Sequence, residues 1–412
     1  MKNQKLNFHP RCFYLLVWLL VSVALPFSRT NATPIQGKCD ARTDRKPRYA
    51  LISAFSGEAD RFISEMRRNN SENRYEGCVV INGHRFSKGR LRGKDVVVVL
   101  TNISLVNATM VTQLTLDKFR ISNIIFSGIA GGVGGVGAND DDPNTPNETP
   151  IGSVIIPKRW GFHQEMYFNN TAETVPCAAI PGLQLNHVLQ DPIQEAATCN
   201  FLFGIATQPG QANQETLFQP DAKNAFFRDT NVSSDNTPQY YLDRNNLQQL
   251  RQVPFPGIPA SENQELKFWF LVDRQMYKTA RKLNVELLDC PQVDQLGRCT
   301  TTPLVPPQLI VGQNGLSGST FVDNEQYRRF VANTLNFDEN GDRNEDTDVL
   351  VLDMETTASA MVAYSNNVPF IAVRSVSDLA GGSESAAVQL NTFFAVAAEN
   401  QARVVLALLD AL

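Results

Sequence analysis

Unbroken apolar runs alternate along the chain with segments of helical periodicity. Runs without polar alternation, such as Val-Val-Val-Val-Leu at 96–100, are typical of strands buried on both faces of a sheet. The predicted strands cover residues 49–54, 96–100, 124–127, 154–157, 309–312, 349–352 and 370–376. The predicted helices cover residues 58–67, 108–119, 355–364 and 388–409. This alternation predicts an α/β fold, and we expect a three-layer α/β/α sandwich.

The alternation of apolar runs with helical segments stops between about residues 168 and 265, where Asn, Gln and Pro are frequent and periodicity is weak. A structureless loop of that length is unusual inside a compact domain, so we predict an insertion, either a small subdomain or a lid. Shorter acidic insertions cover 139–149 and 338–348. The second resembles a calcium loop, but its glycine offset is wrong and no bidentate Glu closes it, so a solvated turn is expected. The predicted domain spans 46–412.

The chain begins with a pattern that is typical of a secretory signal peptide over residues 1–32. Cations precede an apolar stretch at 13–25, and small residues at 30–32 stand at the spacing of a cleavage site. The apolar stretch is shorter than the roughly 20 residues that span a bilayer. We therefore expect an exported protein, periplasmic or secreted, with no stable membrane span after cleavage. An uncleaved anchor is the alternative.

The composition is that of a globular protein with an acidic balance. Hydrophobic residues make up 42% and charged residues 19% of the 412 residues, which excludes a disordered chain or a coiled coil. Lys and Arg number 37 against 42 Asp and Glu, and the first 32 residues hold cations but no acid. The predicted mature chain is therefore more acidic still. A nucleic-acid binder needs a basic surface, so that class is excluded.

Six cysteines follow Cys12, which lies inside the predicted signal. An even number in an exported chain indicates disulfides, although isolated buried thiols are the alternative. Short loops favour two pairs and leave a third: Cys177 with Cys199, Cys290 with Cys299, and Cys39 with Cys78. Six cysteines allow many other pairings, so the connectivity stays open. The spacing does not match a zinc finger.

A glycine motif and the histidines do not stand in the surroundings that a functional site of their kind requires. Residues 132–137, Gly-Val-Gly-Gly-Val-Gly, fit a dinucleotide-binding pattern, but they lead into an acidic segment with a proline instead of a helix. The histidines after the signal, His84, His163 and His187, are scattered, so neither a Ser-His-Asp triad nor a His-rich metal site is predicted. His163 is expected to be packed or hydrogen-bonded.

Four segments are expected at the carboxyl ends of strands, where open α/β sheets bind ligands. They are 54–58 (Ala-Phe-Ser-Gly-Glu), 127–132 (Ser-Gly-Ile-Ala-Gly-Gly), 352–355 (Leu-Asp-Met-Glu) and 374–382 (Arg-Ser-Val-Ser-Asp-Leu-Ala-Gly-Gly). The second is predicted to be a turn whose small residues let a flat ligand lie against backbone. Glu58, Glu355 and Asp378 could then surround that ligand. Each acid alone has a structural interpretation as a cap or turn residue, so the prediction depends on their combination.

In this order the segments resemble the nucleoside phosphorylase superfamily, and within it the 5′-methylthioadenosine/S-adenosylhomocysteine nucleosidases. The resemblance covers about 49–160 and 309–409, and it is most specific at Asp-Met-Glu (353–355) and at Asn-Val-Pro-Phe-Ile-Ala-Val-Arg-Ser-Val-Ser-Asp (367–378). It implies a mixed central sheet with the insertions outside it. Plant bark storage proteins and so-called purine nucleoside permeases resemble the same superfamily, so membership alone does not establish catalysis.

The resemblance implies a role for each acid. Cleavage of a purine N-glycosidic bond passes through an oxocarbenium-like sugar, so the base must be protonated and C1′ must meet a nucleophile. Asp378 would protonate the purine at N7, Glu58 would activate water, and Glu355 would accept hydrogen bonds from the ribose 2′- and 3′-hydroxyls. The further residues that we expect to bind substrate are Met354 on the sugar, Arg374 beside the carboxylates, Phe321 stacked on the purine, Val322 at its edge, and Ala130, Gly131 and Ser377. A core aromatic is the alternative for Phe321.

Phosphorylases that share this resemblance typically place arginines after the first strand and just before the glycine segment. Residues 54–58 contain no Arg, Ile125 and Phe126 precede the glycines, and Arg61 is the nearest candidate. Water is therefore favoured as the nucleophile. No cofactor or metal is expected, and phosphate would be a cosubstrate only in a phosphorylase. The resemblance also implies a homodimer.

Two positions depart from the pattern of the family. Ile129 stands where Ser or Thr is frequent, and Ser319 stands where Asp is frequent. The natural substrate is therefore left open among adenosine-type nucleosides such as 5′-methylthioadenosine and S-adenosylhomocysteine. We predict an exported purine-nucleoside N-ribosyl hydrolase. The alternatives are a phosphorylase and a nonenzymatic nucleoside-binding, uptake or storage protein.

Overall fold

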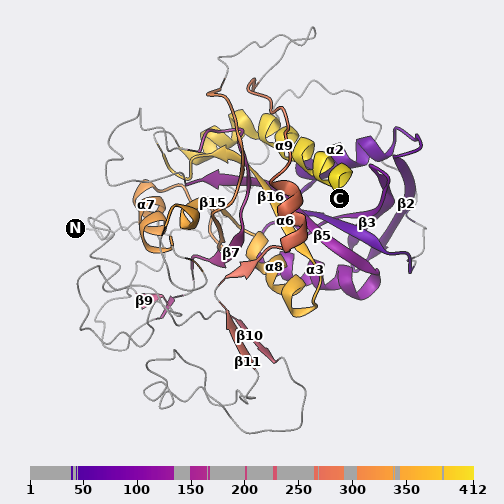
Figure 1. Ribbon diagram of the computed structural model, residues 1–412, viewed down its shortest axis with the longest axis horizontal. Coiled ribbons are helices and arrows are strands. Elements are labelled where there is room, and N and C mark those ends of the chain that lie inside the picture. The colour runs from indigo at the N-terminus through magenta and orange to yellow at the C-terminus, as the bar shows by residue number, and fades with distance from the viewer. Residues whose placement is uncertain are drawn as a thin grey trace, which may run out of the picture. The chain divides into compact units, whose positions relative to one another are not determined.

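The computed structural model divides the chain into two compact units, residues 1–38 and 39–412, and all elements below belong to the second (Figure 1). Apart from short pieces, the described residues are 45–133, 149–164, 269–291, 304–336, 344–382 and 385–412. The predicted signal peptide, the glycines at 134–137 and nearly all of the insertion at 168–265 lie outside them.

A mixed sheet of twelve strands forms the centre of the second unit. Its main path runs β12-β7-β14-β15-β5-β1-β4-β3-β2, and β16 joins β5 to β6, which pairs with β13. The strands are β1 (Arg48–Ser53), β2 (Arg74–Ile81), β3 (His84–Leu91), β4 (Lys94–Leu100), β5 (Ile121–Gly132), β6 (Val154–Ile156), β7 (Arg159–Phe162), β12 (Phe270–Leu271), β13 (Leu309–Val311), β14 (Asn314–Ser317), β15 (Val349–Asp353) and β16 (Phe370–Asp378). Two small sheets pair β8 (Met166–Tyr167) with β9 (Asn200–Phe201) and β10 (Phe226–Asp229) with β11 (Gln264–Lys267).

The inner strands run parallel, as the unbroken apolar runs predict. β1 pairs in parallel with β4 and β5, and β5 pairs in parallel with β16. β2, β3 and β4 are joined antiparallel, and so are β15 and β5, which confirms the mixed sheet. Val96 and Val97 on β4 and Ile371 on β16 are fully buried, because helices cover both faces here.

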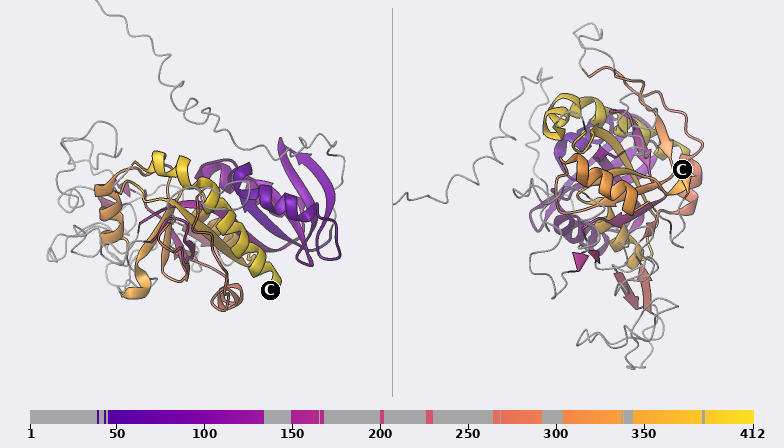
Figure 2. Two further views of the ribbon diagram at one scale, coloured as in Figure 1. Left: turned by 90° about the horizontal axis from the view of Figure 1, so that it is seen from above. Right: turned by 90° about the vertical axis from the view of Figure 1, so that its left-hand side faces the viewer.

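Helices form the outer layers of the sandwich. They are α2 (Ser56–Met66), α3 (Leu105–Lys118), α6 (Arg274–Ala280), α7 (Glu325–Thr334), α8 (Thr356–Ser365) and α9 (Ala386–Ala411), with a 3₁₀ turn, η2 (Glu345–Thr347). α2 and α9 pack together on one face of the sheet, and α3 and α8 pack together on the other. Figure 2 shows α9, the long yellow helix, lying along the sheet. The α/β/α sandwich is therefore confirmed.

α9 alone among the described helices is long and apolar enough, by length and composition, to cross a membrane. However, 61% of its most apolar window is buried inside the protein. It packs against β5, β6 and β16, so it serves here as a core helix.

One local prediction is wrong. Residues 127–132 are not a turn after a short strand but the continuation of β5 through Gly132. Along this stretch β5 pairs with β16 as far as Asp378, and Gly131 and Gly132 also pair with β15. Glycine and alanine weaken a strand in isolation, but ladders on both sides hold the backbone extended here.

The structure joins Cys39 and Cys78 in a disulfide, one of the pairings that the sequence left open. Cys290 is also disulfide-bonded. Cys177, Cys199 and Cys299 lie outside the described residues. The bond between Cys39 and Cys78 ties the start of the second unit to β2.

Trp160 on β7 is fully buried, and it lies directly opposite Gly315 in the parallel pair of β7 and β14. A Cβ added at Gly315 would lie 2.7 Å from Cη2 and from Cζ3 of the indole. That distance is too short for a carbon contact, so Trp160 excludes any side chain at position 315.

We expect Gly315→Ala to lower the free energy of unfolding by about 1–3 kcal/mol, because the indole must shift inside a packed core. Urea denaturation followed by circular dichroism measures the change. Trp160→Phe removes part of the indole, so the double variant should lose less stability than the two single losses added together. Additive losses would show that the clash with Trp160 is not the cause.

Candidate functional site

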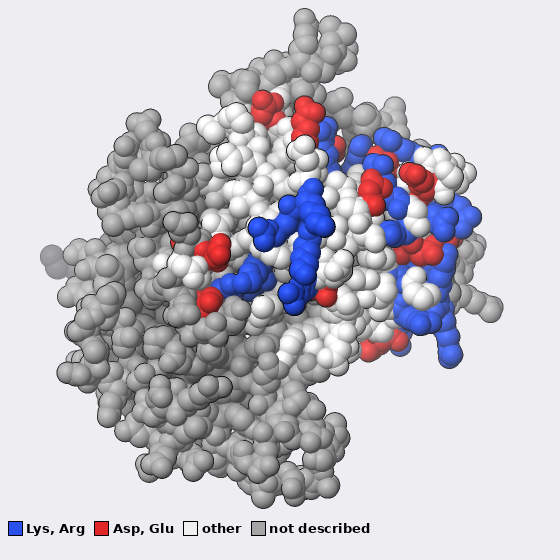
Figure 3. Space-filling model, viewed as in Figure 1, with Lys and Arg blue, Asp and Glu red and all other residues white. Residues whose placement is uncertain are grey.

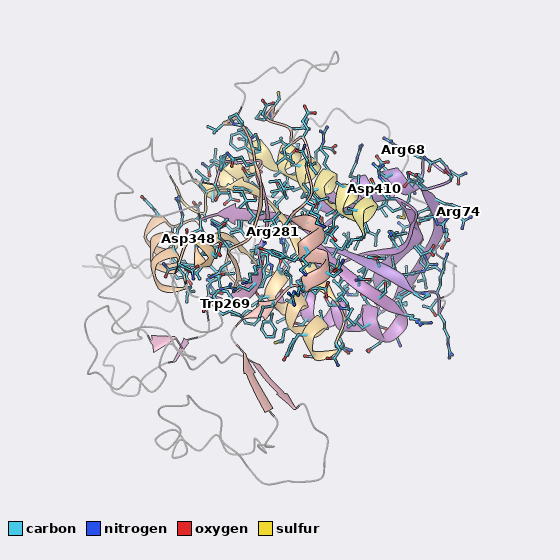
Figure 4. All side chains as sticks on the ribbon, in the orientation of Figure 1. Arg68, Arg74, Trp269, Arg281, Asp348 and Asp410 are labelled. Carbon is cyan, nitrogen blue, oxygen red and sulfur yellow. A yellow bond between two sulfur atoms is a disulfide. The ribbon has the colours of Figure 1, made fainter. Side chains whose placement is uncertain are left out.

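The charged groups of the candidate site are buried, unlike most ion pairs in the part of the chain that the structure describes. On the face shown in Figure 3, Lys and Arg side chains gather over α6 and over the hairpin of β2 and β3. Arg74, labelled in Figure 4, pairs with Glu76 on its own strand, β2, and Arg68, labelled there too, follows α2 and pairs with Glu65 at the end of that helix. By contrast, Glu58, Glu355, Arg374 and Asp378 lie inside, where the carboxyl ends of β5, β15 and β16 meet α2 and α8.

Arg374 is the centre of this arrangement, with 1% of its side chain exposed. Its Nε lies 2.9 Å from Asp353 Oδ2, and its Nη2 lies 3.3 Å from Glu355 Oε2. Its Nη1 lies 3.9 Å from Glu58 Oε1. One guanidinium thus faces three carboxylates.

Two further contacts fix the plane of the guanidinium. Arg374 Nη1 donates to the Ile129 carbonyl at 2.9 Å. The Arg374 Cζ lies 4.6 Å from the centre of the Phe126 ring, which is a cation–π arrangement. Both partners come from β5, so the pairing of β5 with β16 sets the position of the charge.

Glu58 stands in the first turn of α2 and points back toward the sheet. Its Oε2 accepts from the Ala54 amide at 2.7 Å, and its Oε1 accepts from the Ile129 amide at 2.9 Å. Burial raises the pKa of this carboxyl, while Arg374 and the amides oppose the rise. The carboxylate is therefore anchored from α2 and β5 at once.

Gly128 makes the approach of Glu58 to Arg374 possible. A Cβ at this position would lie 2.5 Å from Arg374 Nη1 and 2.9 Å from Glu58 Cδ. Both side chains therefore pass over the bare backbone of β5, which a larger residue would obstruct.

Glu355 is the N-cap residue of α8. Its Oε1 accepts from the Ser104 amide at 3.0 Å, and its Oε2 faces Arg374. Burial raises its pKa to about 7; Arg374 lowers it, and the charges of Asp353 and Glu58 raise it further. Burial among other acids therefore holds the pKa of this carboxyl well above the ordinary value of Glu.

The backbone that donates to Glu355 is strained. Ser104 has φ 110° and ψ 154°, a region that residues with a Cβ rarely enter. Such a conformation costs about 1–3 kcal/mol and is found mainly at functional sites.

Asp378 ends β16 and lies beside Gly131. Its Oδ1 accepts from the Ala380 amide at 3.0 Å, and its Oδ2 accepts from the Ser377 hydroxyl at 2.8 Å. Burial raises its pKa to about 6; the two hydrogen bonds lower it and Asp323 raises it. A Cβ at Gly131 would lie 3.0 Å from Asp378 Oδ1, so the small residue leaves space for the carboxyl.

The remaining predicted residues border this centre to different degrees. Ala130 precedes Gly131 on β5 and is buried, and its carbonyl accepts from the Ser377 hydroxyl at 3.3 Å. Met354, between Asp353 and Glu355, is half-buried. Val322 is buried, while Phe321 is 45% exposed. The exposed ring excludes the alternative that Phe321 is a core aromatic.

His163 is fully buried, and its Nδ1 lies 2.8 Å from the Tyr327 hydroxyl. Burial lowers its pKa to about 4, although the charge of Asp353 opposes the fall. The prediction of a packed, hydrogen-bonded histidine is confirmed.

Arg61, the sequence candidate for a phosphate ligand, is already paired. Its Nη2 lies 3.0 Å from Glu65 Oε1, and its Nε lies 3.8 Å from Glu399 Oε2 on α9. These partners place its charge at the junction of α2 with α9.

Asp353 was quoted in the sequence pattern but given no role, and the structure makes it part of the site. The available signal was an acid just before a helix N-terminus, a position from which a side chain accepts backbone amides. Its contact with Arg374 joins residues far apart in sequence and could not be read from spacing. Over the described part of the chain, no group of three or more His, Cys, Asp or Glu side chains could hold a metal ion.

Known proteins with similar sequences include enzymes and an uncharacterised protein. The chain is 50% identical over 126 residues to a 5′-methylthioadenosine/S-adenosylhomocysteine nucleosidase of Geobacillus kaustophilus, covering 30% of this chain and 47% of that protein. A nucleosidase of the same name from Geobacillus thermodenitrificans is 48% identical over 148 residues, or 36% and 53% of the two chains. An uncharacterised protein of Mycobacterium tuberculosis is 28% identical over 202 residues, or 42% and 75%. The chain thus spans about half the length of the nucleosidases that it matches.

Among solved structures, the nucleosidase from Neisseria meningitidis in complex with methylthio-immucillin-A is 17% identical, with a TM-score of 0.47 over 89% of this chain and 99% of that chain. The family is shown by the sequence. The sequence model of the phosphorylase superfamily matches residues 48–234 and 249–410, which is well over half of the chain. The chain therefore belongs to the phosphorylase superfamily.

Proposed function

We propose that this protein is a nucleosidase that hydrolyses the N-glycosidic bond of adenosine-type purine nucleosides, with 5′-methylthioadenosine and S-adenosylhomocysteine as the substrate class. The observation that carries the proposal is the set of buried acids around the ends of β5 and β16. Burial raises the pKa of Asp378 to about 6, while Glu58 is anchored beside a guanidinium. A proton donor and an ionised base are what glycoside hydrolysis needs.

The roles follow from the surroundings of each acid. Asp378 gives its proton to the departing purine. The bond between C1′ and the purine nitrogen breaks, and its electron pair stays on the purine. Glu58 accepts a proton from the water that attacks C1′. Glu355 accepts hydrogen bonds from the ribose hydroxyls. It is the N-cap residue of α8 and stands next to Met354, which would pack on the sugar. The reaction requires no cofactor, because each proton transfer has a side chain in place.

The charge balance favours water over phosphate as the nucleophile. Arg374 is shared among Asp353, Glu355 and Glu58, so a phosphate placed beside these groups would be repelled. Arg61 is paired with Glu65 and Glu399. Water carries no charge and meets no such repulsion.

The purine would lie against the bare backbone of Ala130 and Gly131. Phe321, exposed in the segment between β14 and α7, would stack on the base, and Val322 would read its edge through the backbone. Nucleosidase relatives with this kind of substrate in their names support the choice of adenine nucleosides.

Export and assembly complete the proposal. The pattern at residues 1–32 supports a signal peptide, so the enzyme would act on nucleosides outside the cytoplasm. Ile103, Val106 and Met110, around the start of α3, are exposed apolar side chains and support a homodimer through this surface.

The first prediction from this proposed function concerns the nucleophile. We expect purified protein to release adenine and free sugar from 5′-methylthioadenosine, S-adenosylhomocysteine or adenosine at the same rate with and without phosphate. Chromatography of the base and the sugar measures both products, with inosine as the comparison substrate. Sugar 1-phosphate, formed only with phosphate present, would assign a phosphorylase. Binding without release would assign a nucleoside-binding or storage protein.

The second prediction concerns the proton donor. Asp378→Asn should lower kcat by about 10²–10⁴-fold, because the amide cannot give a proton to the purine. Nucleoside binding, measured by calorimetry, should remain within a few-fold. Asp60→Asn, on the exposed side of α2, is the matched control and should keep wild-type turnover. Unchanged kcat in Asp378→Asn would remove Asp378 from the mechanism.

The third prediction concerns pH. Because burial raises the pKa of Asp378 to about 6, the protonated acid is lost as pH rises through that value. The ribose acceptor Glu355, whose pKa is raised to about 7, ionises over the next pH unit, so we expect kcat/KM to fall about tenfold per pH unit above roughly pH 7. It should also fall at low pH, because Glu58 must be ionised and its pKa is raised. A profile that is flat between pH 6 and 8 would contradict the assignment of the acid.

A further inference from the structure

Asp353, the last residue of β15, accepts hydrogen bonds at both of its carboxylate oxygens. Its Oδ1 accepts from the Ser317 hydroxyl at 2.6 Å and from the amides of Glu355 and Thr356 at 3.0 and 3.1 Å. Its Oδ2 accepts from the Thr356 hydroxyl and faces Arg374 Nε at 2.9 Å. Every contact comes from a donor, as an acceptor-only carboxylate requires.

These contacts connect the elements that carry the other acids. Through Glu355 and Thr356, Asp353 holds the first turn of α8, which positions the Glu355 side chain. Through Arg374 it holds the guanidinium that faces Glu58 and Glu355.

The Thr356 hydroxyl closes the connection between α8 and β16. It donates to Asp353 Oδ2 and accepts from Arg374 Nε at 2.9 Å. Thr356 and Ser317 are fully buried, so no water competes for these hydrogen bonds.

We propose that Asp353 is a positioning residue of the site, whose carboxylate locks the head of α8 and the guanidinium of Arg374 in one arrangement and so fixes where Glu355 and Glu58 present their oxygens. The inference rests on the proposed nucleosidase function and adds a residue that does not itself touch the substrate. A misplacement of about 1 Å in a catalytic group can cost roughly 100-fold in rate. The effect of losing Asp353 should therefore far exceed that of an ordinary surface acid.

The test compares two variants in the full chain. Asp353→Asn keeps the size of the side chain, but its amide group turns a donor toward Arg374 or Thr356. We expect kcat/KM for adenine release to fall about 10- to 100-fold, with KM raised as the ribose contact at Glu355 loosens and kcat lowered as Glu58 shifts. Thr356→Val removes the connecting hydroxyl without changing charge, and it should lower kcat/KM at least about fivefold. Asp60→Asn is the control for loss of one negative charge.

A second readout separates positioning from mere stability. The groups that face Glu355 are Arg374 from β16, Asp353 from β15, Glu58 from α2 and the Ser104 amide before α3. The carboxyl carbon of Glu355, followed by NMR and assigned by its loss in E355Q, reports its titration directly. Asp353→Asn should lower the titration midpoint by about 1 pH unit, because a neighbouring negative charge is lost. Thr356→Val and Asp60→Asn should leave that midpoint in place.

The outcomes are distinct. Wild-type kcat/KM in Asp353→Asn, or a loss of activity without movement of the Glu355 midpoint, would overturn the proposal. If Asp353→Asn does not fold, wild-type kcat/KM in Thr356→Val overturns it and a loss supports it. If the wild-type protein releases no base, the nucleosidase function fails, and the NMR midpoint still decides whether Asp353 controls Glu355.

Discussion

The site depends on one buried positive charge. Moving a guanidinium out of water is costly, and Arg374 recovers that cost only because carboxylates from three elements meet it. The same geometry sets the chemistry, since one cation cannot neutralise three carboxylates fully. One acid in the group, Glu355, therefore has a pKa that burial raises to about 7. Structure and reactivity thus have the same electrostatic origin.

The sheet brings these groups together. β16 lies between β5 and β6, so Arg374 and Asp378, four residues apart on one strand, both reach the glycine-rich half of β5. β15 meets the same half from its other side at Gly131 and Gly132. The convergence of strand ends predicted from α/β topology is therefore present, but the second segment joins it as a strand instead of a turn.

Many strands and helices of the fold could be predicted from the sequence. Runs such as 96–100 and 370–376 are apolar on both faces, so only a covered strand suits them. The hairpin of β2 and β3 was not predicted, because the aliphatic residues of β2 are confined to its second half and β3 is mostly polar and charged. α7 was also missed, because polar and charged residues outnumber the apolar ones along it.

Part of the site could also be predicted from local sequence patterns. Glu58, Glu355 and Asp378 carry a signal because each stands beside a helix start or a strand end. The contacts between Arg374 and Asp353, and between Ser104 and Glu355, join residues 21 and 251 positions apart, respectively. Local patterns hold no information about such pairs. Nor does a pattern reveal that Ser104 adopts a strained backbone in order to direct its amide at Glu355.

Gly128 illustrates how a site can be encoded by the absence of a side chain. Glu58 and Arg374 occupy the space where its Cβ would stand. Any missense change in this codon, whatever the new residue, adds that carbon. A substitution at Gly128 therefore obstructs the site by its shape, whereas exchange of an acid for its amide keeps the shape and removes the charge.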